Sequence, residues 1–265
     1  MENHSADIIG EIQAYYRVRA STDKYATSPD FNLREVENHY LSRWLTDDIT
    51  VLDAGCGNGY STLCHAARYN AYFIGVDFVP EMIRSANEMK DQFQLRGRVE
   101  FQVGDVTELH FPNAQFDLVI SQRCLLNLPS RDAQWSAMRE IARVLKPDGL
   151  YLMLEGTLQG LRRLNEVRTL FDLKSIPEAE GTYNCFSNKF DEDEMLKVAR
   201  TLFREHVGVE RFGMYYFISR VVHPLLVHPS EPQYDAPINA VAQMICKKIP
   251  NYEDLGHVAL FVFRR

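Results

Sequence analysis

The sequence predicts an α/β fold in which a doubly wound, mostly parallel sheet is covered by helices. β-rich runs recur along the chain and alternate with stretches whose apolar residues have helical spacing. The first run, residues 49–52, is followed by an acid, by glycines at alternate positions and by a helix-compatible stretch over residues 61–68. The second run, residues 71–77, also ends in an acid. In a doubly wound sheet both acids lie at the carboxyl ends of strands, where such folds bind their ligands.

The turn after the first strand has the features of a nucleoside-binding site. Its glycines, Gly55, Gly57 and Gly59, admit positive φ angles and let a ligand lie against the backbone. Asp77 can accept hydrogen bonds from ribose hydroxyls. The glycines are spaced GxGxG rather than GxGxxG, and Asp53 stands two residues before them. Asp53 would repel a pyrophosphate but not a ligand with an ammonium and a sulfonium, so the pattern favours S-adenosylmethionine over NAD.

Residues 53–59 resemble the first motif of the class I (Rossmann-like) S-adenosylmethionine-dependent methyltransferases, and Asp77 matches the acid that this family uses on the ribose. Three later segments resemble the third strand with its adenine-binding acid, the fourth strand, and the helix, turn and strand that follow: residues 101–106, 116–121 and 142–150. These motifs cover roughly residues 49–156 in the family's order. They indicate the cofactor and the type of reaction but say little about the methyl acceptor.

The resemblance implies a set of cofactor-binding residues at the ends of the first four strands. Asp105 would accept a hydrogen bond from the adenine amino group, although an acid at this position can also cap a short helix. Phe78, with Met82 or Ile83, would lie near the adenine face. The predicted set comprises Asp53, Gly55, Gly57, Gly59, Asp77, Phe78, Met82, Asp105, Val106, Ser121 and Gln122.

The residues before the first strand are expected to form a helical lid. Residues 8–18 have apolar groups at mixed helical spacing, residues 33–45 are amphipathic, and a polar loop separates them. In the resembled family such a segment often folds over the cofactor. The lid candidates are therefore Tyr15, Tyr16 and Tyr25; the alternative is that these tyrosines only pack with their hydroxyls in water.

The central elements follow from local signals. A helix is expected from Pro80, which can occupy a first helical turn without losing a hydrogen bond, and a third strand over residues 98–103. Ser130 is expected to cap a helix, and a turn at 146–149 leads into a fifth strand at 150–155. The end of the fourth strand lacks the Asn/Asp-Pro-Pro-aromatic box typical of enzymes that methylate nucleic-acid bases. Asn127 stands where many small-molecule methyltransferases have a histidine.

After residue 156 the family pattern loosens, and acceptor specificity is expected there. The expected elements are a helix-bearing insertion over 157–173, a loop over 176–188, a helix over 191–203 and a sixth strand over 207–212. The aromatic and proline-rich stretch that follows is too long for a structureless loop. It is expected to form a cap of two helices, the second over 238–248, that lines an acceptor pocket or forms a dimer face. The last strand, 258–263, would be antiparallel in the resembled fold.

Composition limits the class of protein. A chain of 265 residues fits one methyltransferase domain, divided here into an N-terminal helical lid (1–48), a cofactor-binding core (49–156) and acceptor-side elaborations with the last strands (157–265). Five cysteines without CxxC spacing favour reduced thiols over disulfides or a metal site. The net charge of −7 disfavours a nucleic-acid partner. The absence of a long apolar run or a secretory signal predicts no membrane association and a cytoplasmic location.

The acceptor and the general base are the least determined features. A hydroxyl acceptor needs a base, for which Glu155 and His223 are candidates, whereas a solvated strand-end acid and a structural histidine are the alternatives. The leading hypothesis is methyl transfer from S-adenosyl-L-methionine to O or N of a small molecule, with a sugar or glycan precursor ahead of a phenolic or polyketide-like acceptor. The product would be S-adenosyl-L-homocysteine. The alternatives are C- or O-methylation of a phenolic acceptor and a catalytically silent, cofactor-binding regulatory module.

Overall fold

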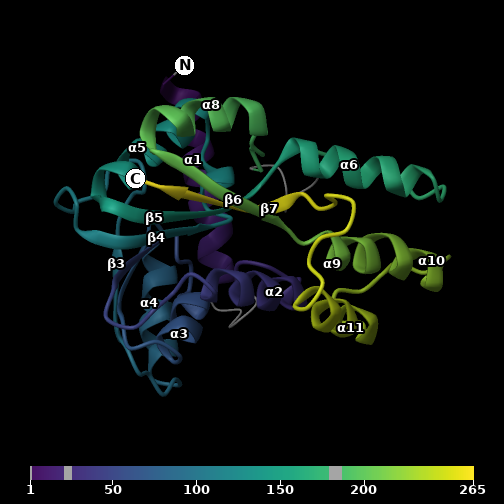
Figure 1. Cartoon of the computed structure of the whole chain (residues 1–265), viewed down its shortest axis with the longest axis horizontal. Coiled ribbons are helices and arrows are strands. Elements are labelled where there is room, and N and C mark those ends of the chain that lie inside the picture. Colours follow the sequence, from purple (N-terminus) through teal and green to yellow (C-terminus); the bar gives the residue numbers. More distant parts are fainter. Residues whose placement is uncertain (1, 21–25, 179–186) are drawn as a thin grey trace.

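A seven-stranded sheet forms the centre of the protein, with the strand order β3-β2-β1-β4-β5-β7-β6 (Figure 1). The computed structural model describes residues 2–20, 26–178 and 187–265, and the sheet is counted within these residues. The strands are β1 (Thr50–Ala54), β2 (Tyr72–Asp77), β3 (Arg98–Val103), β4 (Phe116–Gln122), β5 (Leu145–Gly156), β6 (Glu205–Arg211) and β7 (Val258–Arg264). β7 runs antiparallel to β5 and β6, while the other neighbouring pairs are parallel. This arrangement confirms the predicted fold.

Helices cover both faces of the sheet. They are α1 (Glu2–Arg19), α2 (Phe31–Ser42), α3 (Tyr60–Ala66), α4 (Pro80–Lys90), α5 (Arg131–Val144), α6 (Leu158–Thr169), α8 (Glu192–Leu202), α9 (Gly213–Phe217), α10 (His223–Val227) and α11 (Pro237–Cys246), with a 3-10 turn η2 (Leu125–Asn127) and a π-helical turn η3 (Ile218–Val222). Alternate residues of a strand point to opposite faces. Val51 therefore packs in the cluster formed with α2, α3, α9 and α11, and Leu52 in the cluster formed with α5 and α8. Among the described residues, no helix combines the length and apolar character needed to cross a bilayer.

The first two helices begin as their sequence suggests. Asp30 caps α2 by accepting a hydrogen bond from the backbone N–H of Leu33 at 3.1 Å. α1 packs against α4, and its Tyr16 side chain joins an apolar cluster with Val79 and Met82. The predicted lid thus contributes α1 and Tyr16, whereas Tyr25 lies outside the described residues.

The fifth strand differs from the prediction. β5 begins at Leu145, which pairs with Phe116, rather than at residue 150. The pairing with β4 then shifts register between Phe116 and Leu118, and Asp148 takes a positive φ of 65°. The expected turn at 146–149 is therefore an irregularity within a longer strand.

The stretch before the last strand folds into the predicted cap, here called the C-terminal cap and defined as residues 213–248. It contains α9, η3 and α10, then a proline-rich connection and α11, all at the same end of the molecule as α6 (Figure 1). α11 packs on α2, where the Tyr40 hydroxyl donates a hydrogen bond to the carbonyl oxygen of Cys246 at 2.8 Å. The cap is thereby fixed to the helical layer that borders the carboxyl edge of the sheet.

Candidate functional site

The turn between β1 and α3 has the backbone geometry that its glycines permit. Gly55 and Gly57 have φ angles of 82° and 55°, in the left-handed region that favours glycine. The N–H groups of Gly55 and Cys56 both donate to the carbonyl oxygen of Val76, at 2.8 and 2.9 Å, which joins the turn to β2. A Cβ atom on Gly57 would stand only 2.5 Å from the Thr27 methyl group. The turn is therefore closely covered by the segment that precedes α2.

Two buried carboxylates lie beside this turn. Asp77, at the end of β2, accepts hydrogen bonds from the backbone N–H groups of Gly57 at 2.9 Å and Val79 at 3.0 Å. Asp53, in β1, accepts one from the Thr62 hydroxyl at 2.5 Å. Burial raises the pKa of each carboxyl to about 6, and neither forms an ion pair with a described residue. Because buried carboxylates without a cation are costly, a ligand with an ammonium group and ribose hydroxyls fits this site better than a pyrophosphate.

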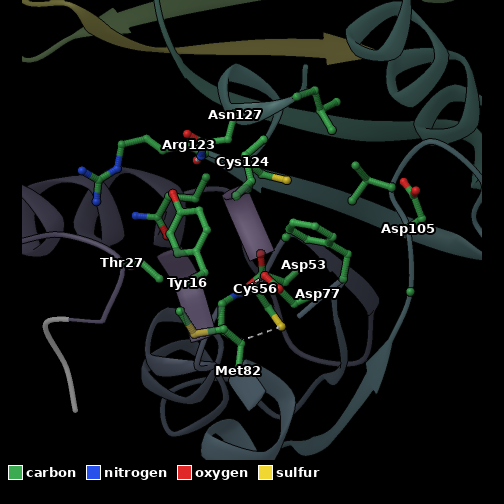
Figure 2. Close-up of a pocket in the computed structure, with 18 of the residues that line it drawn as sticks. Tyr16, Thr27, Asp53, Cys56, Asp77, Met82, Asp105, Arg123, Cys124 and Asn127 are labelled. Carbon is green, nitrogen blue, oxygen red and sulfur yellow. Dashed lines mark hydrogen bonds between the residues drawn. The ribbon is translucent and has the colours of Figure 1, made fainter. Parts of the chain in front are cut away.

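A cavity of about 270 Å³ lies over the turn and both carboxylates (Figure 2). On its far side are Phe78, Met82, Val106 and Asp105. The Asp105 carboxylate accepts hydrogen bonds from the backbone N–H and the hydroxyl of Thr107, both at 2.7 Å. Asp105 therefore both stabilises a local turn and lines the cavity, so the two roles considered for it are compatible.

Most of the predicted cofactor residues meet in this cavity. Those that line it are Asp53, Gly55, Gly57, Asp77, Phe78, Met82, Asp105, Val106 and Gln122. Gly59 and Ser121 do not. Gly59 is at the N-terminus of α3, where a Cβ atom would stand 2.5 Å from the Phe101 ring, so it permits close packing. The Ser121 side chain is buried and its hydroxyl lies 2.8 Å from that of Tyr151.

The cavity also contains residues outside the predicted cofactor set. Tyr16, expected as part of a lid, covers it from α1, and Thr27 covers it from the segment before α2 (Figure 2). Arg123, Cys124 and Asn127 border it from the connection after β4. No signal in the sequence identified Thr27, because its role depends on contacts between distant segments.

A second cavity, of about 930 Å³, adjoins the first. The two share four lining residues: Tyr16, Thr27, Arg123 and Asn127. The rest of the second cavity is formed mainly by α1, residues 28–33, α6, the segments around residues 172–177 and 187–189, the C-terminal cap and residues 257–258. The cap thus lines a cavity, which is one of the two roles expected for it. Together the cavities provide space for a cofactor and for a second molecule in contact with it.

Arg123 occupies the junction between the cavities and is held from two sides. It has a positive φ of 52°, unusual for a residue with a side chain. Its guanidinium donates to the Ser28 hydroxyl at 3.2 Å and lies 3.4 Å from a carboxylate oxygen of Glu37. The carbonyl oxygen of Arg123 accepts a hydrogen bond from the Asn127 amide at 2.8 Å. Arg123 therefore links the end of β4 to the segment that covers the cofactor cavity.

The two predicted general bases lie elsewhere. The oxygens of Glu155 accept backbone hydrogen bonds from Cys124, Leu125 and Leu126, at 3.2, 2.9 and 3.1 Å. Glu155 is fully buried, which raises its pKa to about 7, and it lines neither cavity. His223 is buried at the start of α10, outside both linings, and burial lowers its pKa. The structure therefore assigns Glu155 to holding the chain after β4 and does not support either residue as a base.

The chain also resembles known proteins over its central part. Residues 51–149 match the family model of the methyltransferase domain. Over these residues the chain is similar to the class I, S-adenosylmethionine-dependent methyltransferases. The match contains the glycine turn and the carboxylates Asp53 and Asp77, which line the smaller cavity. The cofactor of the domain is S-adenosylmethionine.

Curated relatives are similar to part of the chain, and a solved structure is similar to it in fold. The chain is 33% identical over 99 residues to 27-O-demethylrifamycin SV methyltransferase of Amycolatopsis mediterranei, covering 37% of this chain and 35% of that protein. It is 37% identical over 126 residues to demethylmenaquinone methyltransferase of Leptospira interrogans, covering 46% and 47%. The chain thus spans less than half of the length of these curated relatives. In fold, it resembles a structure from Haloferax volcanii of a methyltransferase with the Trm112 activator, with a TM-score of 0.63, 16% identity, and coverage of 94% and 96%.

The affinity for cofactor is expected to fall as the pH decreases below about 6. In the free protein, Asp53 and Asp77 have pKa values of about 6, so both are largely protonated at pH 5. The ammonium and the ribose hydroxyls favour the ionised carboxylates, so binding lowers both pKa values and releases protons. We expect the Kd for S-adenosylhomocysteine to rise by about 10- to 100-fold between pH 7.5 and pH 5.

Calorimetric titration at several pH values, in two buffers of different ionisation enthalpy, measures both the Kd and the protons released. Asp53→Asn should reduce the proton release near pH 6, because one of the two carboxyls is then absent. A Kd that is independent of pH between 5 and 7.5 would contradict this assignment.

Proposed function

We propose that the protein transfers the methyl group of S-adenosylmethionine to an oxygen or nitrogen atom of a small molecule bound in the larger cavity. The observation that carries this proposal is that the two cavities meet at Tyr16, Thr27, Arg123 and Asn127. A small molecule in the larger cavity would therefore reach the cofactor within the protein. A volume of about 930 Å³ is in the range of small-molecule binding sites.

Different residues bind the cofactor and the acceptor. Asp77 and Asp53 bind the polar groups of the cofactor, and Asp105 lies where it can accept a hydrogen bond from adenine. The bound cofactor supplies an already activated methyl group. Arg123 and Asn127 orient the acceptor at the junction of the cavities. Since the reaction then depends mainly on alignment and exclusion of water, such positioning can account for roughly 7 to 11 kcal/mol of the barrier.

A sugar or glycan precursor is the favoured acceptor. The larger cavity is bordered by several charged and hydroxyl-bearing side chains, including Ser28, Asp30, Arg168, Lys189 and Arg220, which suit a polar ligand. A phenolic or polyketide-like acceptor is the second candidate, supported by relatives that are named for methylating demethylrifamycin and demethylmenaquinone. The two candidates differ in whether affinity comes mainly from hydrogen bonds or from apolar contact.

The proposal is tested by incubating the protein with methyl-labelled S-adenosylmethionine and a panel of sugars, sugar phosphates, amino sugars and phenols. We expect label to be transferred to at least one member of the panel, and no transfer in Asp77→Ala. For an active acceptor, Asn127→Ala should lower kcat at least tenfold while the Kd for S-adenosylhomocysteine changes less than threefold, because Asn127 acts at the acceptor. Tight binding of S-adenosylmethionine without turnover on any acceptor class would favour the silent regulatory module instead.

Self-association through the C-terminal cap is a separate part of the proposal. Leu225, Leu226, Val241 and Met244 are exposed apolar residues on α10 and α11. Exposed apolar residues of this kind are typical of protein interfaces. Light scattering on wild type and on Leu226→Glu with Met244→Glu would show whether the wild type is a dimer and whether the double variant is monomeric. A monomeric wild type would exclude the dimer.

A further inference from the structure

The larger cavity has more cations than its neighbouring carboxylates balance. Besides Arg19 of α1, four cationic side chains that line it are partly or fully buried: Arg123, Arg168, Lys189 and Arg220. Arg220 forms an ion pair with Asp30, and Arg123 lies 3.4 Å from Glu37. Within the described part of the chain, neither Arg168 nor Lys189 has a carboxylate within ion-pair distance. These four cations thus have two carboxylate partners, Asp30 and Glu37, whereas the other carboxylates that line the cavity, Asp172 and Glu231, are exposed.

Lys189 is the most buried of these unbalanced cations. Only 7% of its surface is exposed. Its ammonium donates hydrogen bonds to the carbonyl oxygen of Glu178 and to the Ser187 hydroxyl, the latter at 3.1 Å. An ammonium has three donors, so among the described residues one proton has no acceptor. Burial lowers the pKa of Lys189, and the negative charge of Glu178 offsets this only in part.

His257 shows that the cations converge on one region. Its ring lies 5.0 Å from that of Tyr216, and its Nδ1 atom is buried without a hydrogen-bond partner among the described residues. The pKa of His257 is lowered to about 3, first by burial and then by the positive charges of Lys189, Arg220 and Arg123. His257 also lines the larger cavity. Three cations therefore act on a neutral histidine at the cavity wall.

We propose that this region is an anion-binding site for the acceptor, in which Lys189, Arg123 and Arg220 around His257 hold a phosphoryl or carboxylate group. The inference rests on the proposed function, because it defines the chemistry of the molecule that is methylated. An anion in this position supplies the negative charge that the wall lacks, and it accepts the remaining Lys189 proton. A sugar phosphate and a uronic acid are the two forms of a sugar precursor that carry such a group.

The first experiment measures anion binding without methyl transfer. Protein saturated with S-adenosylhomocysteine, so that the cofactor cavity is filled, is titrated calorimetrically with inorganic pyrophosphate, glucose 1-phosphate, glucuronate and neutral methyl glucoside. We expect saturable binding of a phosphorylated compound or of glucuronate, at least tenfold tighter than that of methyl glucoside. The phosphate and carboxylate arms identify which anion is preferred. No preference over the neutral sugar in any arm would overturn the proposal.

Matched variants locate the site. Lys189→Met should weaken binding of the preferred anion at least tenfold, and Lys189→Arg should retain it within about threefold. Lys197→Met removes an exposed lysine of α8 that lines neither cavity, and should leave binding unchanged. The Kd for S-adenosylhomocysteine serves as the test of folding. A folded Lys189→Met protein that binds the anion as tightly as wild type would overturn the assignment.

A site-specific readout uses the wild-type protein during the titration, and a variant only to assign the signal. The imidazole nitrogen resonances of His257, assigned by loss of signal in His257→Gln, should shift when the anion binds, and the pKa of His257 should rise. Anion binding that leaves these resonances unchanged would place the anion elsewhere. The proposed function and the anion site can fail separately. Methylation of neutral acceptors only would support the proposed function and contradict the anion site. Anion binding without turnover on any acceptor would support the anion site and contradict the proposed function.

Discussion

Replacing Asp77 with alanine is expected to weaken binding of S-adenosylhomocysteine by at least about 100-fold. The carboxylate holds two backbone N–H groups, of Gly57 and Val79, and presents its charge to the cavity. Hydrogen bonds to a charged group contribute roughly 1.5 to 3 kcal/mol each, so losing two ribose contacts costs about 3 to 6 kcal/mol. Each 1.4 kcal/mol is about a tenfold change in affinity.

Calorimetric titration of Asp77→Ala beside Asp91→Asn tests this expectation. Asp91 is exposed at the end of α4 and lines neither cavity, so its substitution should leave the Kd unchanged. Asp77→Asn should lie between wild type and alanine, since an amide retains one acceptor oxygen but not the charge. A Kd of Asp77→Ala within threefold of wild type would show that the cofactor binds elsewhere.

Replacing Glu155 with alanine is expected to lower the free energy of unfolding by about 3 kcal/mol or more. Three backbone N–H groups, of Cys124, Leu125 and Leu126, donate hydrogen bonds to Glu155 and would lose their acceptor. Leaving buried donors unsatisfied costs about 1 to 3 kcal/mol for each group. The loss should appear as a lower urea midpoint with an unchanged slope.

The control is Glu166→Ala on the exposed side of α6, which should change stability by less than about 0.5 kcal/mol. The comparison also separates a structural from a catalytic role. If Glu155 acted as a base, Glu155→Gln would abolish turnover while stability and cofactor affinity stayed near those of wild type. If the role of Glu155 is structural, its substitution should lower the free energy of unfolding. Turnover should then decrease as well, because Asn127 and Arg123 belong to the same stretch of chain.

The pH dependence of stability gives an independent check on Glu155. Its pKa rises from 4.5 to about 7 on folding, so the native protein binds this proton more tightly than the unfolded chain. The stability associated with the protonated form is complete below pH 4.5 and is lost as the pH rises through 7. Glu155→Gln should therefore flatten the change in stability between pH 5 and pH 7.5, as measured by urea unfolding. An unchanged pH profile would contradict the raised pKa.

The sequence predicted that most of the proposed cofactor residues meet at one cavity, because the signals for this are local. The spacing of Gly55 and Gly57, with acids at the ends of two strands, specifies a turn and the edge at which the strands end. Ser121 was misplaced because its direction depends on strand alternation: it points to Tyr151 inside the sheet, while the neighbouring Gln122 lines the cavity.

The acceptor side could not be predicted in the same way. The larger cavity combines Arg123, Lys189 and His257 with residues of α1 and the C-terminal cap, which lie far apart in sequence. Glu155 and His223 were chosen by their residue type and by being at a strand end or before a proline. Neither criterion reveals that three backbone N–H groups donate to Glu155, or that His223 is buried outside both cavity linings.

The position of α1 has a consequence for turnover. Ile9, Ile12 and Tyr16 of this helix form one side of the cofactor cavity, and Tyr16 is also shared with the larger cavity. Because Tyr16 packs against Val79 and Met82, we expect exchange of spent for fresh cofactor to require displacement of α1 from these residues. Such opening of a packed segment is often slower than chemistry in enzymes with lids. The residence time of S-adenosylhomocysteine, rather than the methyl-transfer step, would then set the maximal rate. The rate at which α1 opens would therefore limit turnover.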